Sequence, residues 1–193
     1  NIDKEIIKGN LFGKEIVFFD QDNNFFKFNL GEKKLEKISL SFPFENFEIT
    51  DFGIYEKKIY FLDEKNNQIT RHNQILDSFS KGQIWLKNKV DLQNAISMAI
   101  DGSIYLLKKD GQVIKFNSGI QMPFELEKIS PLFSSPLKIF TDSNSSFIYI
   151  LEPENKRILV FDKKTQKLKT QFISEKFDQL KELSDIGDII WVQ

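Results

Sequence analysis

Four aspartates are the residues whose type and position best suit a metal site. Asp51, Asp101, Asp142 and Asp185 lie near the ends of segments that we predict to be the inner strands of a repeated unit. Carboxylates that converge on one axis bind hard cations such as calcium well. Polar turns between strands explain the same residues equally well. A calcium site at these four positions is therefore one of two interpretations.

Three further carboxylates, Asp20, Asp63 and Glu152, each end a predicted strand just before an asparagine-containing turn. A ring of such groups is a second candidate set of metal ligands. A carboxylate in this position also accepts hydrogen bonds from the N–H groups of the turn, which organises the hairpin. We expect this structural role for all three.

His72 is the only histidine in the chain and the obvious candidate for a general base. A base needs a partner within hydrogen-bond distance. In the repeat, however, His72 occupies a position that other copies fill with Phe28, Phe116 and Phe161. We therefore expect a structural histidine that is hydrogen-bonded in a core or lies near a rim, because an unpartnered buried polar group costs about 1–3 kcal/mol. The sequence contains no motif of a nucleophile elbow, a phosphate-binding loop, a dinucleotide-binding fold or a zinc protease. The hypothesis of an enzyme therefore has no motif that identifies catalytic residues.

The composition excludes several other classes of site. Lysine and arginine number 27 against 28 aspartates and glutamates, a net charge of -1, so we expect no nucleic-acid partner. The absence of cysteine removes thiolate zinc sites and disulfides. No apolar run approaches the roughly 18 residues of a membrane span. We expect no membrane insertion of this segment and, calcium apart, no cofactor.

A repeat runs through the whole chain. Five copies of a short hydrophobic pattern each consist of an isoleucine followed by an anchor residue, and successive anchors are 43, 45, 44 and 42 residues apart. The anchors are Val17, Tyr60, Tyr105, Tyr149 and Trp191. After each of the first four comes a polar turn and a second hydrophobic run, which is the pattern of a β-hairpin.

Each copy is predicted to contain four strands: one before the hairpin, two in it and one after it. The fourth strand is predicted at Leu35–Ser39, at Leu126–Ser130, which has the same five letters, and at Leu168–Phe172. In the second copy either Ile75–Phe79 or Ile84–Leu86 fits this strand.

Four strands per copy at this period predict an all-β protein, a β-propeller of four-stranded antiparallel blades. Residues 1–193 form a single propeller in this interpretation, with blades at about 5–47, 48–92, 93–135 and 136–179 and a partial fifth at 180–193. Because two strands of the fifth copy are missing, we expect the residues to belong to a larger propeller of six to eight blades.

The hairpins at Ile59–Asp63 and Ile148–Glu152, with the partner strand Arg157–Asp162, resemble the NHL and TolB-like propeller repeats of bacterial proteins. The resemblance covers nearly the whole chain. It implies a six-bladed scaffold that binds proteins, glycans or nucleic acid, and it extends to a related group of metal-dependent lactonases.

Phe42, Phe44 and Phe47 gather in one proline-containing connection, and residues 122–124 and 131–133 echo that composition. If exposed, these rings form a ligand-binding surface. The alternative is that they fold back and fill the cleft between adjacent blades, because loops with so much apolar area are rarely left in water. The lysine pairs at 33–34 and 163–164 are interpreted as solvated turns.

Two functions follow from these observations. The first is a non-catalytic binding scaffold that presents loops to a protein or glycan partner and works as a module of a larger bacterial protein, beside further blades or another domain of the same polypeptide. The alternative is a metal-dependent, lactonase-like hydrolase that uses the channel carboxylates.

Overall fold

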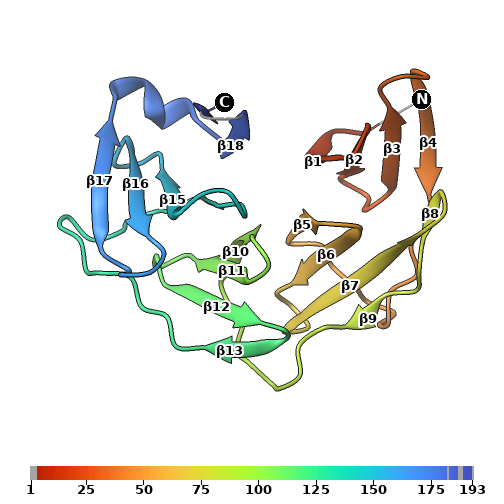
Figure 1. Ribbon diagram of the computed structural model, residues 1–193, viewed down its shortest axis with the longest axis horizontal. Helices are drawn as coiled ribbons and strands as arrows, with labels where there is room; N and C mark the ends of the chain where they lie inside the picture. The colour runs from red at the N-terminus through yellow and green to blue at the C-terminus, as the bar shows by residue number, and fades with distance from the viewer. Residues whose placement is uncertain (1–3, 182, 187–188, 193) are drawn as a thin grey trace. The chain divides into compact units, whose positions relative to one another are not determined.

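The computed structural model describes residues 4–181, 183–186 and 189–192. Its repeated antiparallel sheets confirm the predicted all-β, β-propeller fold (Figure 1). The chain forms two compact units, Asn1–Trp85 and Leu86–Gln193, each with its own sheets and core. Within the described ranges, no helix has the length and apolar character needed to span a membrane.

The first unit contains two blades. The strands of the first blade are hydrogen-bonded in chain order: β1 (Ile6–Phe12), β2 (Glu15–Asp20), β3 (Phe25–Asn29) and β4 (Lys34–Ile38). The second blade also begins in chain order, with β5 (Asp51–Tyr55), β6 (Lys58–Asp63) and β7 (Gln68–Ile75).

Two short strands share the outer edge of the second blade. β8 (Ser78–Phe79) pairs with the end of β7, and β9 (Gln83–Ile84) pairs with its middle at Thr70 and Arg71. Between them the Gly82 N–H donates to the carbonyl of Ser41 at 2.7 Å, away from β7. Each of the two segments predicted for the outer strand is therefore paired in part: Ser78–Phe79 of the first as β8, and Ile84 of the second as part of β9.

The second unit contains two further blades and the start of another. The third blade consists of β10 (Ala95–Ile100), β11 (Ile104–Lys108), β12 (Val113–Asn117) and β13 (Ile120–Met122). The fourth consists of β14 (Lys138–Phe140), β15 (Phe147–Glu152), β16 (Arg157–Asp162) and β17 (Leu168–Ile173). A 3-10 helix, η1 (Glu175–Gln179), leads to a two-stranded sheet of β18 (Leu183–Ile186) and β19 (Ile189–Val192), the predicted partial fifth copy.

The identical pentapeptides Leu35–Ser39 and Leu126–Ser130 adopt different structures. The first supplies most of β4, whereas the second is not a strand, so that prediction was wrong. In the third blade, Ser118 and Gly119 have φ values of 49° and 82° and form a tight hairpin turn that places β13 against β12. β13 thus occupies the outer edge of the third blade before the pentapeptide begins. Pro123, which has no N–H, ends the pairing of β13 with β12.

Adjacent blades within a unit contact each other through their first strands, β1 with β5 and β10 with β14. Their facing sides form apolar cores. The core of the first unit contains Phe12, Val17, Phe19, Phe25, Ile38, Phe52, Ile59 and Phe61. The core of the second contains Ala99, Tyr105, Leu107, Val113, Ile129, Ile139, Ile148, Ile150, Leu159 and Phe161.

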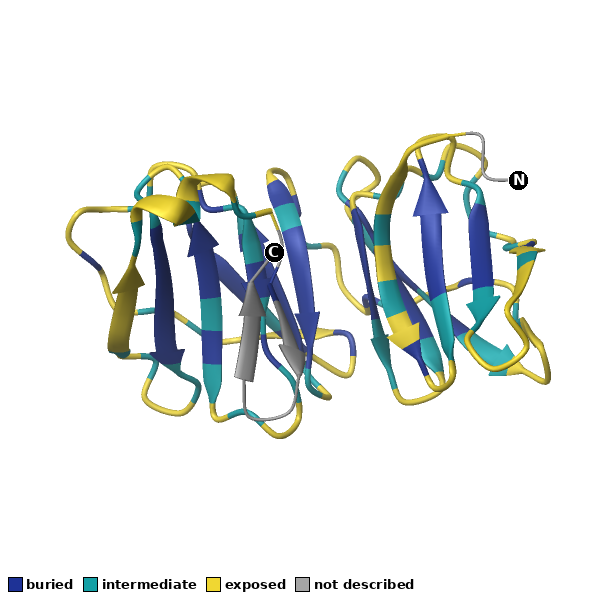
Figure 2. Ribbon diagram, turned by 90° about the horizontal axis from the view of Figure 1, so that it is seen from above, coloured by how far each residue is buried: buried dark blue, intermediate teal, exposed yellow. Residues whose placement is uncertain are grey.

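Burial falls toward the outer edge of each blade, and Figure 2 shows dark central strands beside lighter edges. β17 is the longest outer strand, and its last two residues, Phe172 and Ile173, are 53% and 66% exposed.

Carboxylates organise two of the hairpins as predicted. Asp20 Oδ1 accepts the N–H groups of Asp22 and Asn24, both at 2.9 Å. Asp63 Oδ1 accepts the N–H of Asn66 at 2.9 Å. These bonds lock the turns after β2 and β6, because the acceptor is already fixed at the end of a buried strand.

Candidate functional site

A groove of about 550 Å³ lies on the second unit. Residues 110–112, in the turn between β11 and β12, and Val113, the first residue of β12, form one part of its lining. Residues 124–129, 132 and 133, in the connection from β13 to β14, form the rest. A second hollow of about 370 Å³ shares Gln112, Val113 and Phe124 with it and is also lined by Ile114 and residues 121–123, so the two hollows adjoin each other.

The turn and the connection are fitted closely to each other at Gly111. Its φ is +86°, a conformation that favours glycine, and a Cβ built there would lie 2.0 Å from Cδ2 of Phe133. The Phe133 ring therefore packs directly on the backbone of the turn. This contact fixes one side of the groove.

Phe124 is held in a similar way. Its ring meets Tyr105 edge-on at 5.5 Å between centroids, and Lys115 Nζ lies 5.6 Å from the ring centre. Edge-to-face and cation–π contacts of this kind stabilise one ring orientation. Phe124 is half-buried and keeps part of its surface in the groove.

A buried ion pair anchors the other end of the connection. Arg157 Nε donates to Glu152 Oε2 at 2.6 Å, and both side chains are almost completely buried. The Arg157 guanidinium also donates to the carbonyl of Pro131, and Glu152 Oε1 accepts the Ser134 N–H at 2.6 Å. Glu152 was predicted to bind the turn after its own strand, and it does receive the Asn155 side-chain N–H at 3.0 Å. Its backbone partner, however, is the connection from the preceding blade.

The first residues of the connection lie against the fourth blade. Glu125 N–H donates to the Gln166 side-chain oxygen at 2.8 Å, and Glu127 N–H donates to the Gln166 carbonyl at 2.9 Å. Phe124 and Leu126 are half-buried while Glu125 and Glu127 are exposed, the alternation of an extended segment. One edge of this segment is thus bonded to the fourth blade.

The rim of the groove is acidic. Asp110, Glu125 and Glu127 line it and are exposed, against one exposed lysine, Lys128. Leu132, at the same rim, is 70% exposed. The groove therefore combines apolar surface with net negative charge.

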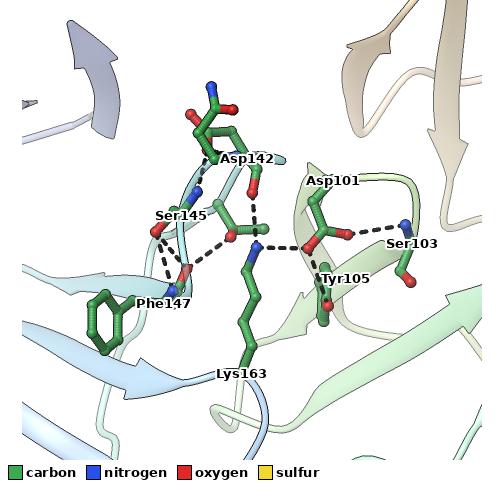
Figure 3. A network of polar contacts seen from close by, with 9 residues as sticks. Asp101, Ser103, Tyr105, Asp142, Ser145, Phe147 and Lys163 are labelled. Carbon is green, nitrogen blue, oxygen red and sulfur yellow. Dashed lines mark hydrogen bonds and ion pairs between the residues drawn. The ribbon is translucent and has the colours of Figure 1, made fainter. Parts of the chain in front are cut away.

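A second polar cluster lies at the opposite ends of these strands, where the third and fourth blades meet (Figure 3). Lys163 Nζ donates to Asp101 Oδ2 at 2.6 Å and to the carbonyl of Asp142 at 2.8 Å. Asp101 Oδ1 also accepts the Ser103 N–H at 3.0 Å. The lysine and Asp101 side chains are only 15% and 13% exposed, so the pair joins the blades in a mostly dry environment.

Tyr105 completes this cluster. Its hydroxyl donates to Asp101 Oδ2 at 3.3 Å. Burial raises the pKa of the Tyr105 phenol, and the adjacent Asp101 carboxylate raises it further. The phenol therefore remains a hydrogen-bond donor at neutral pH and is not a proton acceptor.

Of the predicted metal residues, Asp101 and Asp142 are the two whose side chains the structure describes within the second unit, and they lie close together. Asp101 and Asp142 both contact Lys163, but Asp142 does so through its carbonyl, and its carboxylate accepts the N–H groups of Asn144 and Ser145. Asp51, in the first unit, forms an ion pair with Lys8. The Asp185 side chain lies outside the described residues.

No group of three or more histidine, aspartate or glutamate side chains suited to a metal ion occurs in the part of the chain that the structure describes. The Asp101 carboxylate forms an ion pair with the Lys163 ammonium, which already neutralises its charge.

The aromatic connection of the first unit is packed on its blades. Phe42 and Phe47 stack with their ring centroids 3.8 Å apart, and both meet Phe61 edge-on. Phe44 is half-buried. Two of the three predicted ligand-binding rings thus also contribute to the contact between the blades.

His72 is fully buried in this region, which agrees with a structural role. Its Nδ1 lies 3.1 Å from the Ser80 carbonyl, which requires that this nitrogen carries the proton. Among the described residues, Nε2 has no hydrogen-bond partner. Burial lowers the pKa of the imidazole, and the bond to Ser80 only partly offsets that effect.

Sequence reasoning missed Lys163. It was interpreted with Lys164 as a solvated pair, which is correct only for Lys164. Nothing local distinguishes the two lysines, because the partner of Lys163 lies 62 residues earlier in the chain. The sequence indicates the groove only in part: residues 122–124 and 131–133 combine proline with apolar residues, and several of them line it.

No family model matches the sequence, and no curated protein matches it. The resemblance to NHL and TolB-like repeats therefore stays a prediction at the level of the subfamily.

Solved structures match the fold. PorZ, a bacterial surface component of the type-IX secretion system of Porphyromonas gingivalis, is similar with a TM-score of 0.65 and 15% identity over 99% of this chain and 24% of that one. An auxiliary nutrient binding protein from Bacteroides ovatus gives a TM-score of 0.59 and 14% identity over 83% of this chain and 38% of its own. Hsv2p of Kluyveromyces lactis gives a TM-score of 0.66 and 14% identity over 100% of this chain and 65% of its own.

At these identities the likeness establishes the fold alone, and this chain spans between 24% and 65% of the length of these three proteins. The conclusion from geometry and comparison together is a β-propeller.

Proposed function

We propose that this chain is a non-catalytic binding scaffold whose second unit captures a protein partner in the groove between residues 110–113 and 124–133. The observation that carries the proposal is the groove itself, a preformed depression with half-buried phenylalanines, an exposed leucine and an acidic rim. Binding sites typically combine concave apolar surface with a few fixed polar groups.

The rigidity of the groove supports this role. Gly111 and Phe133 hold one side, and the buried pair of Arg157 and Glu152 holds the end of the connection. A preorganised surface loses little conformational entropy when a partner binds. Loops held by a rigid scaffold are also where binding residues concentrate.

The polar cluster in Figure 3 supports a scaffold over an enzyme. Its lysine, aspartate and tyrosine are hydrogen-bonded to one another across the two blades, and burial keeps the phenol protonated. Groups used in this way stabilise the contact between blades. The descriptions of two matched proteins, a nutrient binding protein and a secretion-system surface component, agree with a binding role.

A display experiment tests the proposal. A random-peptide phage library is selected on the intact chain, and the enriched clones are measured against Leu132→Asp. Because Leu132 is exposed, the variant is expected to fold and to lose the selected peptides. Leu76→Asp, at an 88% exposed leucine of the first unit, is the matched control and should keep them. A selection that enriches no clone, or only clones that bind Leu132→Asp equally well, contradicts the proposal.

In the first unit, Phe42, Phe44 and Phe47 are proposed as a separate contact surface, independent of the groove. Peptides from the same selection test them through Phe44→Ala, because the ring of Phe44 is not part of the stack on Phe61. Unchanged binding would remove this surface from the proposal.

A further inference from the structure

We infer that the groove of the second unit takes an extended peptide with basic side chains, bound partly through its backbone along residues 124–128. The inference rests on the proposed function and names the class of ligand. Three features of the groove carry it: an extended segment with a free edge, the length of the depression, and the sign of its charge.

The first feature is the backbone of the connection. The N–H groups of Glu125 and Glu127 donate to Gln166 of the fourth blade. In an extended chain, neighbouring N–H groups point to opposite sides, so the backbone groups of Leu126 and Lys128 face away from that blade. In the described part of the chain neither of these two residues makes a backbone hydrogen bond, and both line the groove.

A free strand edge of this kind is the usual template for an added strand. A peptide that pairs with Leu126 and Lys128 gains backbone hydrogen bonds, and its alternate side chains then point toward or away from the surface. Phe124, Phe133 and Leu132 line the same groove and offer apolar surface to such side chains, next to the polar groups of its rim.

The second feature is length. The main groove and the adjoining hollow share Gln112, Val113 and Phe124, so the lining of the two runs from residues 132–133 to residues 121–123. Two adjoining hollows along one stretch of chain fit an extended peptide better than a compact ligand.

The third feature is charge. Asp110, Glu125 and Glu127 outnumber Lys128 at the rim. Opposite charge on a partner aids association and excludes acidic competitors. Lysine or arginine side chains at alternate positions of the peptide would face this rim while valine or leucine side chains face the phenylalanines.

The probe is a fluorescein-labelled peptide of alternating lysine and valine, and binding to the intact chain is followed by fluorescence anisotropy. The matched peptide of alternating glutamate and valine is expected not to bind. A third peptide with N-methyl groups on alternate residues keeps the charges but cannot pair along a strand edge, and it is expected to bind about tenfold more weakly.

Glu125→Lys tests the location, because within the described chain the hydrogen bond of Glu125 is made by its backbone N–H and its side chain forms no hydrogen bond or ion pair that would be lost. We expect about tenfold weaker binding of the lysine–valine peptide. Glu154→Lys, at an exposed position outside the groove, makes the same change in net charge and should leave binding within about twofold.

Equal affinity for Glu125→Lys and Glu154→Lys, or for the methylated and unmethylated peptides, overturns the inference. Its failure is distinct from that of the proposed function. Library clones that depend on Leu132 but carry no basic residue would keep the binding role and reject the basic peptide. Binding of a xylo-oligosaccharide mixture that Leu132→Asp abolishes would reject a peptide site in favour of a glycan site.

Discussion

Lys163, in the turn after β16, donates a 2.6 Å hydrogen bond to Asp101, in the turn after β10, and so joins the fourth blade to the third. Sixty-two residues separate the two side chains in the sequence. The bond is thus a tertiary contact that forms only when the two blades have docked.

Lys163→Met should lower the free energy of unfolding by about 1–3 kcal/mol, because Asp101 would lose its cationic partner in a largely buried position. Urea titration at neutral pH measures the change. Lys164→Met alters the neighbouring exposed lysine and should stay within about 0.5 kcal/mol of the parent. Equal effects of the two substitutions would contradict a specific role for Lys163.

Gly111→Ala should lower stability by at least about 1 kcal/mol, since alanine would be strained at φ +86° and its Cβ would collide with Phe133. Thermal and urea unfolding give the magnitude. The control is Gly31→Ala: the atom nearest a Cβ there is 3.5 Å away, an ordinary contact. Loss of peptide binding with unchanged stability would mean that Phe133 moves aside without cost.

His72 should make the stability of the protein fall in mild acid. Its pKa in the folded state is lowered from 6.5, so below that pH the unfolded chain binds more protons than the folded one. The contribution is complete above pH 6.5 and is lost below it, by at most about 1.4 kcal/mol per pH unit until the folded-state pKa is reached. Unfolding titrations between pH 7.5 and 5 measure the slope.

The comparison variant for that titration is His72→Leu, which cannot titrate. It is expected to be less stable at every pH, because the Ser80 carbonyl loses its donor, but to show a shallower decline. Parallel curves for the two proteins would rule out His72 as the source of the pH dependence.

Divalent cations should not alter the melting temperature of the protein. The Asp101 carboxylate is hydrogen-bonded to Lys163, and the Asp142 carboxylate accepts two backbone N–H groups. Differential scanning fluorimetry with calcium, manganese and zinc tests this expectation. A rise with calcium that Asp142→Asn abolishes would favour the metal-dependent hydrolase instead.

Periodicity was enough to predict the blades. An isoleucine before each anchor, followed by a polar turn, marks a buried hairpin, and the hairpins formed where that pattern stood. The pattern works because the alternation of buried and exposed positions is a local property of the strand.

What sits at the edge of a blade was harder to predict. Leu126–Ser130 repeats Leu35–Ser39 letter for letter, yet only the earlier segment supplies a strand. The deciding residues are Ser118 and Gly119, whose tight turn fills the edge first. Which segment pairs with the edge of a blade depends on the geometry of the preceding turn, and the composition of the segment itself does not determine it.

The candidate site was predictable only in outline. Aromatic connections stood out in the sequence, but whether each one is filled or hollow depends on contacts across the repeat. Phe42 stacks on Phe47 and contacts Phe61 edge-on. Phe124 packs on Tyr105 and Phe133 packs on Gly111, and both line the groove.

The outer strand β17 has a consequence for handling the protein. Phe172 and Ile173 end a six-residue strand whose outer side can pair with another chain, which makes this edge the place where concentrated solutions should begin to associate. Lys167 and Lys169 supply the repulsion that opposes such pairing. Added salt screens that repulsion, so the solubility of this protein should fall as ionic strength rises.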